Sequence, residues 1–352
     1  MAPIRDEFAC RDLTWPSHDL CLHDLASSFG QVLLFPISET KRAAYFLLRM
    51  RWFVTIEAGA KPVPGYTLTH LLGAGASSEV WEAQSAEGKK LAFKFLDCRK
   101  LSPSMIAGEV KLLRSLTGLN HPHIIPLTGV HSWGKYLILM MELADGSLDD
   151  LHRSYSEKTN GNVPPDHALD LLDQAASALD FLGTAKLTNS TGSRGLQHCD
   201  VKPSNLLLVG HRLKVADFGL CAGAGWHMHR GWKGTYPYAA PELFNGAAAP
   251  GTDQYALAVT FCKMVMGDRP FFGSTQGNGP PAGIPVDFAK MRDKEVLVLA
   301  RALHPHPSAR WPSCKTFIQA LRNAQETPRT GESVRIFPRG LHGSMRHELA
   351  AS

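Results

Sequence analysis

The chain changes its hydrophobic pattern near residue 146, and this change restricts the folds it can adopt. From Tyr66 to Leu143, runs such as YTLTHLL, LAFKFLD and KYLILMMEL alternate apolar with polar residues, which predicts antiparallel strands. A segment from Ser104 to Leu116 interrupts them with helical spacing. Later runs, HALDLLDQAASALDFLG, DQYALAVTFCKMVMG, DKEVLVLARALH and SCKTFIQALRNA, each predict an amphipathic helix. We therefore expect an α+β fold with a small sheet-rich lobe followed by a larger helical lobe.

Changes in composition set the expected domain boundaries. We expect one bilobal domain over residues 62–325, with the first lobe at about 66–143 and the second at about 144–325. Residues 1–61 form an extension whose role the sequence does not reveal, and residues 326–352 form a flexible basic tail. An apolar content of 44% in 352 residues is enough for a large packed core.

Charge and cysteine usage argue against several classes of protein. The net charge of +5 is small, so we expect no nucleic-acid partner. The seven cysteines are widely spaced and form no C-x-x-C motif, which favours a reducing, cytoplasmic location. The first residues lack a secretory signal, and the most apolar stretch, Ala43 to Ile56, is shorter than the ~20 residues of a membrane span. The oligomeric state stays open.

A glycine hairpin connects the first two predicted strands. Gly73, Gly75 and Val80 lie in LLGAGASSEV, between two strand-like runs. Because glycine has no Cβ, backbone amides in such a hairpin can approach phosphate oxygens. Taken alone, the stretch is explained better as an ordinary hairpin.

Lys94 lies in the next predicted strand, and Glu109 lies in the predicted helix that follows. A lone lysine in a strand is usually a solvated edge residue. It gains a function when a carboxylate holds its ammonium group against phosphates. Glu109 is placed to supply that carboxylate.

The segments HCDVKPSNLLL and ADFG contain the residues that indicate a chemistry. Asp200 and Asn205 bracket a loop that leads into an apolar strand, and Asp217 follows a second short strand, LKVA. A phosphoryl donor with Mg²⁺ needs hard oxygen ligands and a separate carboxylate near the attacking hydroxyl. We therefore expect Asn205 and Asp217 to bind the metal, Asp200 to orient the nucleophile, and Lys202 to neutralise the phosphoryl group.

Together, these motifs resemble the eukaryotic-type protein kinase family over about residues 66–324. The landmarks that match in order and spacing are Gly73, Gly75, Val80, Lys94, Glu109, His198 to Asn205, Asp217 to Gly219, Ala240 to Glu242, Asp253 and Arg310. The resemblance implies ATP and Mg²⁺, with Mn²⁺ as an alternative metal, and a protein hydroxyl as acceptor. Lys202 and Thr235 resemble the serine/threonine branch, in which both hydrogen-bond around the catalytic aspartate. Several segments are also similar to serine/threonine kinases of planctomycete bacteria.

The same resemblance implies a nucleotide site between the lobes. The residues it assigns to this site, besides Lys94 and Glu109, are Leu72, Gly73, Gly75, Val80, Ala92, Met141, Glu142, Leu143 and Leu207. Met141 would be the gatekeeper, and the backbone of Glu142 and Leu143 would meet adenine. Core packing is an equally good explanation for Val80, Ala92 and Leu207.

The resemblance gives other residues structural roles. It implies a stack of Leu113, Leu127, His198 and Phe218 that ties helix and metal loop together. A histidine in an apolar setting is more often a core residue than a ligand, and we assign that role to His198. Asp253 would bond the catalytic-loop backbone, and Glu242 would pair with Arg310.

The sequence departs from the family at the activation segment. Cys199 replaces the arginine that precedes the catalytic aspartate in most regulated kinases, and residues 220–234 contain no Ser, Thr or Tyr. We therefore expect a kinase that is not switched on by phosphorylation of this segment. His227 and His229, beside Trp226 and Trp232, lack a third ligand, which argues against a metal site there.

The alternative function is a pseudokinase, a module that binds nucleotide or acts as a scaffold. Ser77, Ser78 and Cys199 support it, because they differ from the family pattern. The enzyme is favoured because all six polar residues that the reaction needs are present: Lys94, Glu109, Asp200, Lys202, Asn205 and Asp217.

Overall fold

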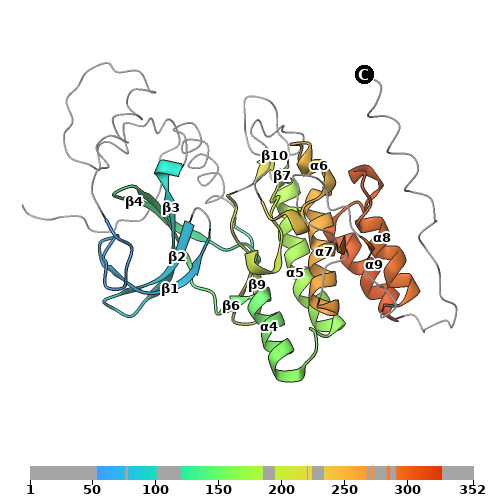
Figure 1. The fold of residues 1–352 in the computed structure, drawn as a ribbon, viewed down its shortest axis with the longest axis horizontal. Coiled ribbons are helices and arrows are strands. Elements are labelled where there is room, and N and C mark those ends of the chain that lie inside the picture. The colour runs from blue at the N-terminus through green and yellow to red at the C-terminus, as the bar shows by residue number, and fades with distance from the viewer. Residues whose placement is uncertain are drawn as a thin grey trace, which may run out of the picture.

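The computed structural model describes residues 54–75, 78–100, 120–184, 195–219, 221–223, 234–267, 271–272, 284–285 and 291–326. The predicted helix at 104–116, the chain before residue 54 and the tail after residue 326 lie outside these ranges. Figure 1 shows the two predicted lobes, with a sheet on the left and a mainly helical body on the right. No helix in the described ranges is both long and apolar enough to span a membrane.

Five antiparallel strands form the sheet of the first lobe. They are β1 (Tyr66–Ala74), β2 (Ser78–Ser85), β3 (Lys90–Asp97), β4 (Leu127–Trp133) and β5 (Tyr136–Glu142). Their order in the sheet is β1–β2–β3–β5–β4. The alternation of apolar residues predicts all of them except β4. In β4 the register shifts between Leu127 and Gly129, so its sequence lacks a clear period of two.

One face of this sheet packs into an apolar core. It is centred on Phe93, Phe95 and Ile138, which are fully buried. Ile56, from the chain ahead of β1, packs against this cluster. The packed lobe therefore includes residues before Pro62, where the sequence places the domain boundary.

The opposite face carries Lys94. Val80 is its cross-strand neighbour on β2, Ala92 lies two residues earlier on β3, and Met141 lies opposite Ala92 on β5. Side chains of directly paired residues point to the same side of a sheet. These four residues, which the sequence assigns to the nucleotide site, therefore share one face.

Helices and short strands build the second lobe. The helices are α4 (Leu148–Thr159), α5 (Pro165–Thr184), α6 (Pro241–Phe244), α7 (Thr252–Met266), α8 (Asp293–Ala302) and α9 (Cys314–Glu326). The strands are β6 (Gly146–Ser147), β7 (Leu196–Gln197), β8 (Leu206–Val209), β9 (Arg212–Val215), β10 (Ala222–Gly223), β11 (Phe271–Phe272) and β12 (Ile284–Pro285). Strands β6, β8 and β9 form one small sheet, and β7 pairs with β10.

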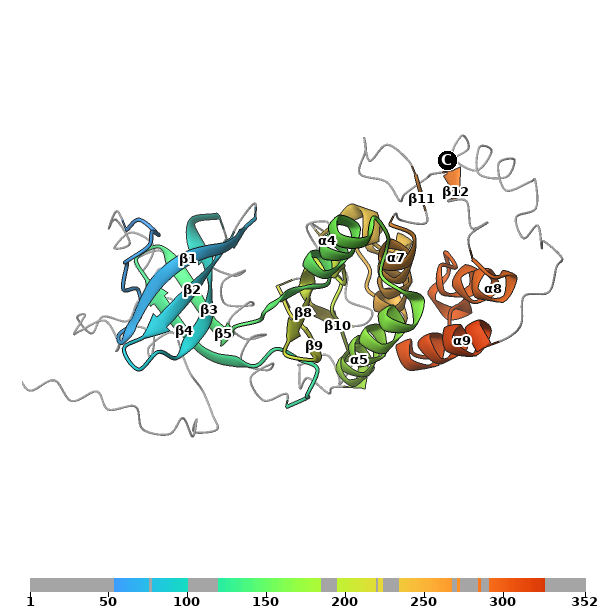
Figure 2. The ribbon, with the colours of Figure 1, turned by 90° about the horizontal axis from the view of Figure 1, so that it is seen from below.

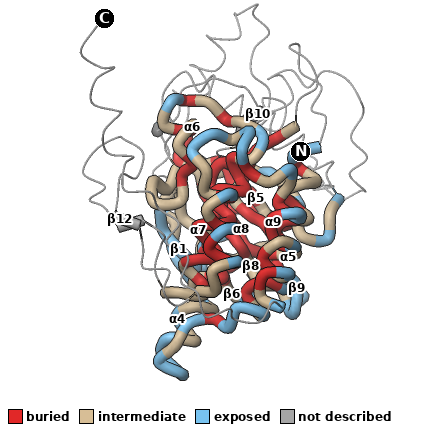
Figure 3. The backbone as a smooth tube through the Cα atoms, turned by 90° about the vertical axis from the view of Figure 1, so that its right-hand side faces the viewer, coloured by how far each residue is buried: buried red, intermediate tan, exposed pale blue. Residues whose placement is uncertain are grey.

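The main core of this lobe lies among α5, α7 and α9. Figure 2 shows α5 beside α7, with the pair of α8 and α9 on their far side from the sheet lobe. Buried backbone concentrates around these helices and β8 in Figure 3. Helix α7 is bounded by Gly251 and Gly267, whose φ angles of 90° and 78° suit glycine.

Four of the helices, α5, α7, α8 and α9, confirm the predicted amphipathic segments. Helix α4 was not predicted, because only Leu148 among its residues is buried and no apolar stripe marks it. Its start is stabilised by a capping box instead. The Asp150 amide donates to Ser147 Oγ at 3.2 Å, and the Ser147 amide donates to Asp150 Oδ2 at 2.9 Å.

Candidate active site

The hairpin of β8 and β9 brings the predicted metal ligands together. Asn205 immediately precedes β8, and Asp217 follows β9 by two residues. Because these strands are antiparallel, the start of one lies beside the end of the other, with Leu206 opposite Val215. The Ala216 amide donates to the Asn205 carbonyl at 2.9 Å.

The Asp200 carboxylate receives three hydrogen bonds from the other predicted catalytic residues. The Thr235 amide donates to Oδ1 at 3.0 Å, and Lys202 Nζ and Asn205 Nδ2 donate to Oδ2 at 2.8 and 3.0 Å. Lys202 Nζ also donates to Thr235 Oγ1 at 2.6 Å. The Asp200 side chain is only 8% exposed, so this charge is held by fixed donors rather than by water.

Lys94 connects the two lobes at this point. Its Nζ donates a hydrogen bond to Asp217 Oδ1 and forms an ion pair with it. The face of the first sheet that carries Lys94 is therefore turned toward the second lobe. The predicted partner Glu109 lies outside the described residues.

The ion pair affects the proton affinity of Asp217. Burial acts to raise the pKa of this carboxyl, but the charge and hydrogen bond of Lys94 outweigh it, with a smaller contribution from His198. The pKa of Asp217 is therefore held below its ordinary value. An ionised carboxylate is the form that a metal ligand or a lysine partner requires.

Asn205 and Asp217 fit a magnesium ion. Asn205 uses its Nδ2 to donate to Asp200, which leaves its amide oxygen as the atom for a metal. Within the described ranges, no group of three His, Cys, Asp or Glu residues is placed to hold a metal. Mg²⁺ commonly uses one or two carboxylates together with substrate phosphates, so a sparse set of hard oxygen donors suits it.

Two residues of the site have left-handed backbone conformations. Cys199 has a φ of 65° and Asp217 a φ of 67°. This conformation costs a non-glycine residue about 1–2 kcal/mol, and it is often found at functional sites. At Cys199 it is supported by Asp253, whose Oδ1 accepts from the Cys199 amide at 2.8 Å and whose Oδ2 accepts from the His198 amide at 2.7 Å. Burial raises the pKa of Asp253 above its ordinary value despite these bonds.

His198 is a structural residue in this fold. It is fully buried, and its Nε2 lies 2.9 Å from the Ala216 carbonyl, which can only accept. The centroids of the His198 and Phe218 rings are 5.2 Å apart. The predicted stack also includes Leu127, which packs against a separate cluster of Cys98, Leu137 and Leu139. Leu113 lies outside the described residues.

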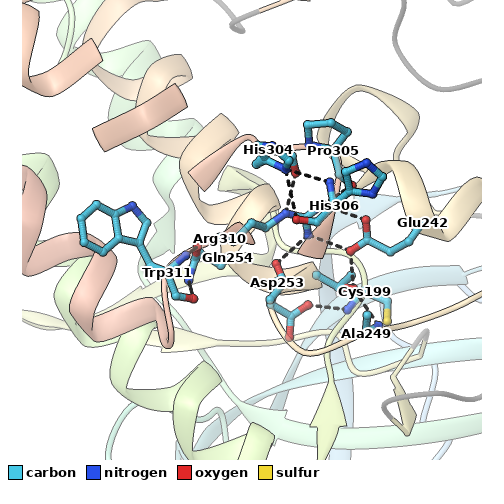
Figure 4. Close-up of polar contacts among 12 residues, drawn as sticks. Cys199, Glu242, Ala249, Asp253, Gln254, His304, Pro305, His306, Arg310 and Trp311 are labelled. Atoms are coloured by element: carbon cyan, nitrogen blue, oxygen red, sulfur yellow. Dashed lines mark hydrogen bonds and ion pairs between the residues drawn. The ribbon is translucent and has the colours of Figure 1, made fainter. Parts of the chain in front are cut away.

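A buried ion pair holds the region around α6 together, as Figure 4 shows. Arg310 Nη1 and Nη2 donate to the two carboxylate oxygens of Glu242 at 2.7 and 2.8 Å. The remaining donors of the guanidinium reach the carbonyls of His304, Gly251 and Pro305. The predicted pairing of Glu242 with Arg310 and the predicted role of Asp253 are therefore present as contacts.

The glycine hairpin is open to solvent. Gly73 and Gly75 are exposed, and the Gly75 amide donates to the Ser78 carbonyl at 2.8 Å. A Cβ built at Gly73 would meet no atom within 4 Å, so packing alone does not require glycine there. Leu72 is 44% exposed beside it. Ser77 lies outside the described residues.

The remaining predicted nucleotide contacts lie where the lobes join. Glu142 ends β5, Leu143 follows it, and Leu207 lies on β8. All three are partly buried. Here the structure also shows a residue that sequence reasoning missed: Lys214 on β9 donates a hydrogen bond to Glu142 Oε2. The available signal was a lysine at a polar position in LKVA, immediately ahead of Asp217.

A model of the protein kinase domain matches residues 66–335. The chain belongs to the protein kinase family. This kinase domain is 30% identical over 294 residues to the serine/threonine-protein kinase PknA of Mycobacterium tuberculosis, covering 76% of this chain and 64% of PknA. It is 30% identical over 276 residues to PknI of the same organism, covering 73% of this chain and 41% of PknI. The matches thus span less than two thirds of each of these relatives.

The likeness extends to a solved structure. A mutant of the Mycobacterium tuberculosis PknI kinase domain superposes with a TM-score of 0.57 and 28% sequence identity, covering 77% of this chain and 100% of that one. The predicted kinase fold, with an antiparallel sheet lobe and a helical lobe, is confirmed. These mycobacterial relatives do not bear on the resemblance to planctomycete kinases, which stays a prediction.

Proposed function

We propose that this kinase domain is an active enzyme that transfers the γ-phosphoryl group of ATP to a serine or threonine hydroxyl of a protein. The observation that carries the proposal is the convergence of Lys202, Asn205 and Thr235 on the Asp200 carboxylate. Burial of a carboxylate is unfavourable unless donors surround it, and buried charges held in this way are concentrated at functional sites. The likeness to serine/threonine kinases supports the same class of acceptor.

Each of these residues has a role in the proposed reaction. Asp200 orients the substrate hydroxyl and accepts its hydrogen bond, while Lys202, held between Asp200 Oδ2 and Thr235 Oγ1, offsets negative charge on the phosphoryl group. Asn205 and Asp217 would hold Mg²⁺, or Mn²⁺ in its place. When bound, the metal would supply positive charge that offsets the negative charge of the phosphate groups.

The nucleotide would lie between the lobes. Lys94 would contact its phosphates, together with the exposed backbone of Gly73 and Gly75. The adenine would meet the backbone of Glu142 and Leu143. Its apolar surroundings would come from Leu72, Val80, Ala92, Met141 and Leu207.

Metal-dependent transfer tests this function directly. We expect the full chain to transfer radiolabelled phosphate from ATP to a generic protein substrate with Mg²⁺, at a rate on the order of 1 to 100 per second if fully active. Excess EDTA should abolish the transfer, and added Mg²⁺ should restore it. Tight binding of ATP with no transfer to itself or to any substrate would contradict the proposal. That result would support the alternative, a pseudokinase.

We also propose that the enzyme works without a phosphate on its activation segment. The buried Cys199 thiol has no positive charge to offer a phosphate. The described residues around it are Asp200, Asp253, Thr235, Thr252, Tyr238 and apolar residues, with no cation among them. The segment 220–234 also lacks an acceptor hydroxyl. A switch of this kind requires a hydroxyl that accepts the phosphate and a positive charge that pairs with it, and these two features remove both.

Phosphatase treatment tests this independence. We expect enzyme treated with a broad-specificity phosphatase to keep its rate within about twofold, because no phosphate–arginine contact is lost. Intact-mass and peptide mass spectrometry should find residues 217–234 unmodified in active enzyme. Loss of activity on treatment, with recovery on rephosphorylation in this segment, would overturn the proposal.

The cytoplasmic location also remains a proposal, supported by the spacing of the cysteines.

A further inference from the structure

The β8–β9 hairpin contacts both the segment ahead of β4 and the segment that follows β5. Ahead of β4, the Ile125 amide donates to the Val215 carbonyl at 2.9 Å, and the Val215 amide donates to the His123 carbonyl at 2.8 Å. The His123 ring reaches the Leu213 carbonyl at 3.0 Å through Nδ1. The segment that leads into β4 is thus bound to β9.

The segment from Glu142 to Ser147, which we call the hinge, leads from β5 into the second lobe and is bound to the same hairpin. Gly146 pairs with Leu208, the Asp145 amide donates to the Leu208 carbonyl at 2.8 Å, and the Gly210 amide donates to Asp145 Oδ2 at 2.7 Å. These bonds hold the end of the hinge that belongs to the second lobe. They leave open how the other end, at Glu142, is oriented.

Lys214 holds that other end. Its Nζ donates to Glu142 Oε2, and the two side chains are 15% and 34% exposed. Glu142 is the last residue of β5 and is paired with Leu91 on β3, so the bond joins the sheet lobe to β9. Lys214 lies opposite Leu207 in the hairpin. The ion pair therefore links the β8–β9 strand pair, which carries Leu207 of the proposed adenine site, to Glu142, the first residue of the hinge.

We propose that Lys214 is a positioning residue that orients the hinge for nucleotide binding by holding the Glu142 side chain. The inference rests on the proposed function, because the hinge backbone at Glu142 and Leu143 is where adenine would bind. With both ends of the short hinge attached to β8 and β9, its peptide groups keep few orientations. Nucleotide affinity falls when the free hinge spends time in conformations that cannot bind adenine. A hinge held in fewer conformations therefore keeps more of its affinity.

Removing the lysine charge tests this inference. We expect Lys214→Met to weaken ADP binding and raise the KM for ATP by about fivefold, as for the loss of one partly exposed ion pair. The kcat should stay within about twofold, because the variant affects ground-state and transition-state binding alike. Hydrogen exchange of the free protein should also become faster at hinge amides 143–147. A purely structural role would lower the melting temperature without this split between KM and kcat.

Three matched variants make the test sharp. Lys214→Arg keeps the charge and should stay within about twofold of wild type, and the reversed pair Glu142→Lys with Lys214→Glu should recover much of the loss. Lys315→Met breaks the exposed ion pair of Lys315 with Asp173, on α9 and α5, and should leave nucleotide binding unchanged.

Several results would overturn the inference. If Lys214→Met is unchanged in nucleotide affinity and hinge exchange while wild type binds and turns over ATP, the inference fails and the proposed function stands. A lower KM, or a loss in kcat alone, would also contradict it. Wild-type protein that binds no nucleotide would overturn the proposed function itself. If Lys214→Met does not fold, Glu142→Gln, which breaks the same ion pair from its other side, should show the same rise in KM, and an unchanged KM would overturn the inference.

Discussion

Asp200→Asn is expected to lower phosphoryl transfer by about a hundredfold to ten-thousandfold, the range typical for loss of a general acid–base group. Asparagine has the same shape, but its NH₂ group would place a third donor where Lys202 and Asn205 already donate to Oδ2. It also removes the negative charge that would attract the proton of the substrate hydroxyl. Initial rates with saturating ATP and Mg²⁺ measure the loss, and ADP binding should stay within about threefold because Asp200 is not proposed to touch the nucleotide.

The matched control for this variant is Asp173→Asn. Asp173 lies on α5 and pairs with Lys315, and both side chains are partly exposed. The substitution makes the same change in charge away from the site, so the rate should stay within about twofold. Folding of both variants is checked by thermal melting. If Asp200→Asn kept more than about a tenth of the wild-type rate, the proposed role of Asp200 would be wrong.

Arg310→Met is expected to lower the free energy of unfolding by about 3–5 kcal/mol, as for the breaking of a buried ion pair. The Arg310 side chain is completely buried, and that of Glu242 is 11% exposed. The variant leaves the Glu242 carboxylate with only the hydroxyl of Thr252, at 2.7 Å, among its described partners. It also leaves three backbone carbonyls without their guanidinium donor. Urea unfolding at neutral pH measures the difference.

Two comparisons separate the buried charge from general loss of packing. The double variant Glu242→Met with Arg310→Met removes both charges and should recover part of the loss, because no unpaired charge remains. Lys315→Met, which breaks an exposed pair, should cost at most about 1 kcal/mol. A loss at Arg310→Met no larger than that of Lys315→Met would show that the Glu242–Arg310 pair does not stabilise the lobe.

The elements with a strong period were predictable from the sequence, and those without one were not. Helix α5 has apolar residues along a broad face and was predicted, whereas α4 is polar apart from Leu148 and depends on the cap between Ser147 and Asp150. Strand β4 was missed because a register shift breaks its alternation. It forms at the edge of the sheet because β5 pairs with all of its residues except Thr128.

The candidate site shows the same division. Asp200, Lys202 and Asn205 lie within one short loop, so their spacing already predicts that they act together. Thr235 lies 33 residues beyond Lys202, and only the family resemblance predicted that it belongs to the same site. Lys214 was not found at all, because nothing near it in the sequence indicates that its partner is Glu142, 72 residues away.

The sequence by itself determined the strands and helices with a clear period, and it determined the short loop with its carboxylate, lysine and amide. Local spacing is enough for these, because neighbouring residues on one element have little freedom in how they lie. Only the tertiary structure decided that Lys94 contacts Asp217, which is 123 residues away, and that Lys214 holds the hinge through Glu142. Such contacts depend on how two lobes and a hairpin are placed against each other, and that placement results from packing over the whole domain rather than from any local pattern.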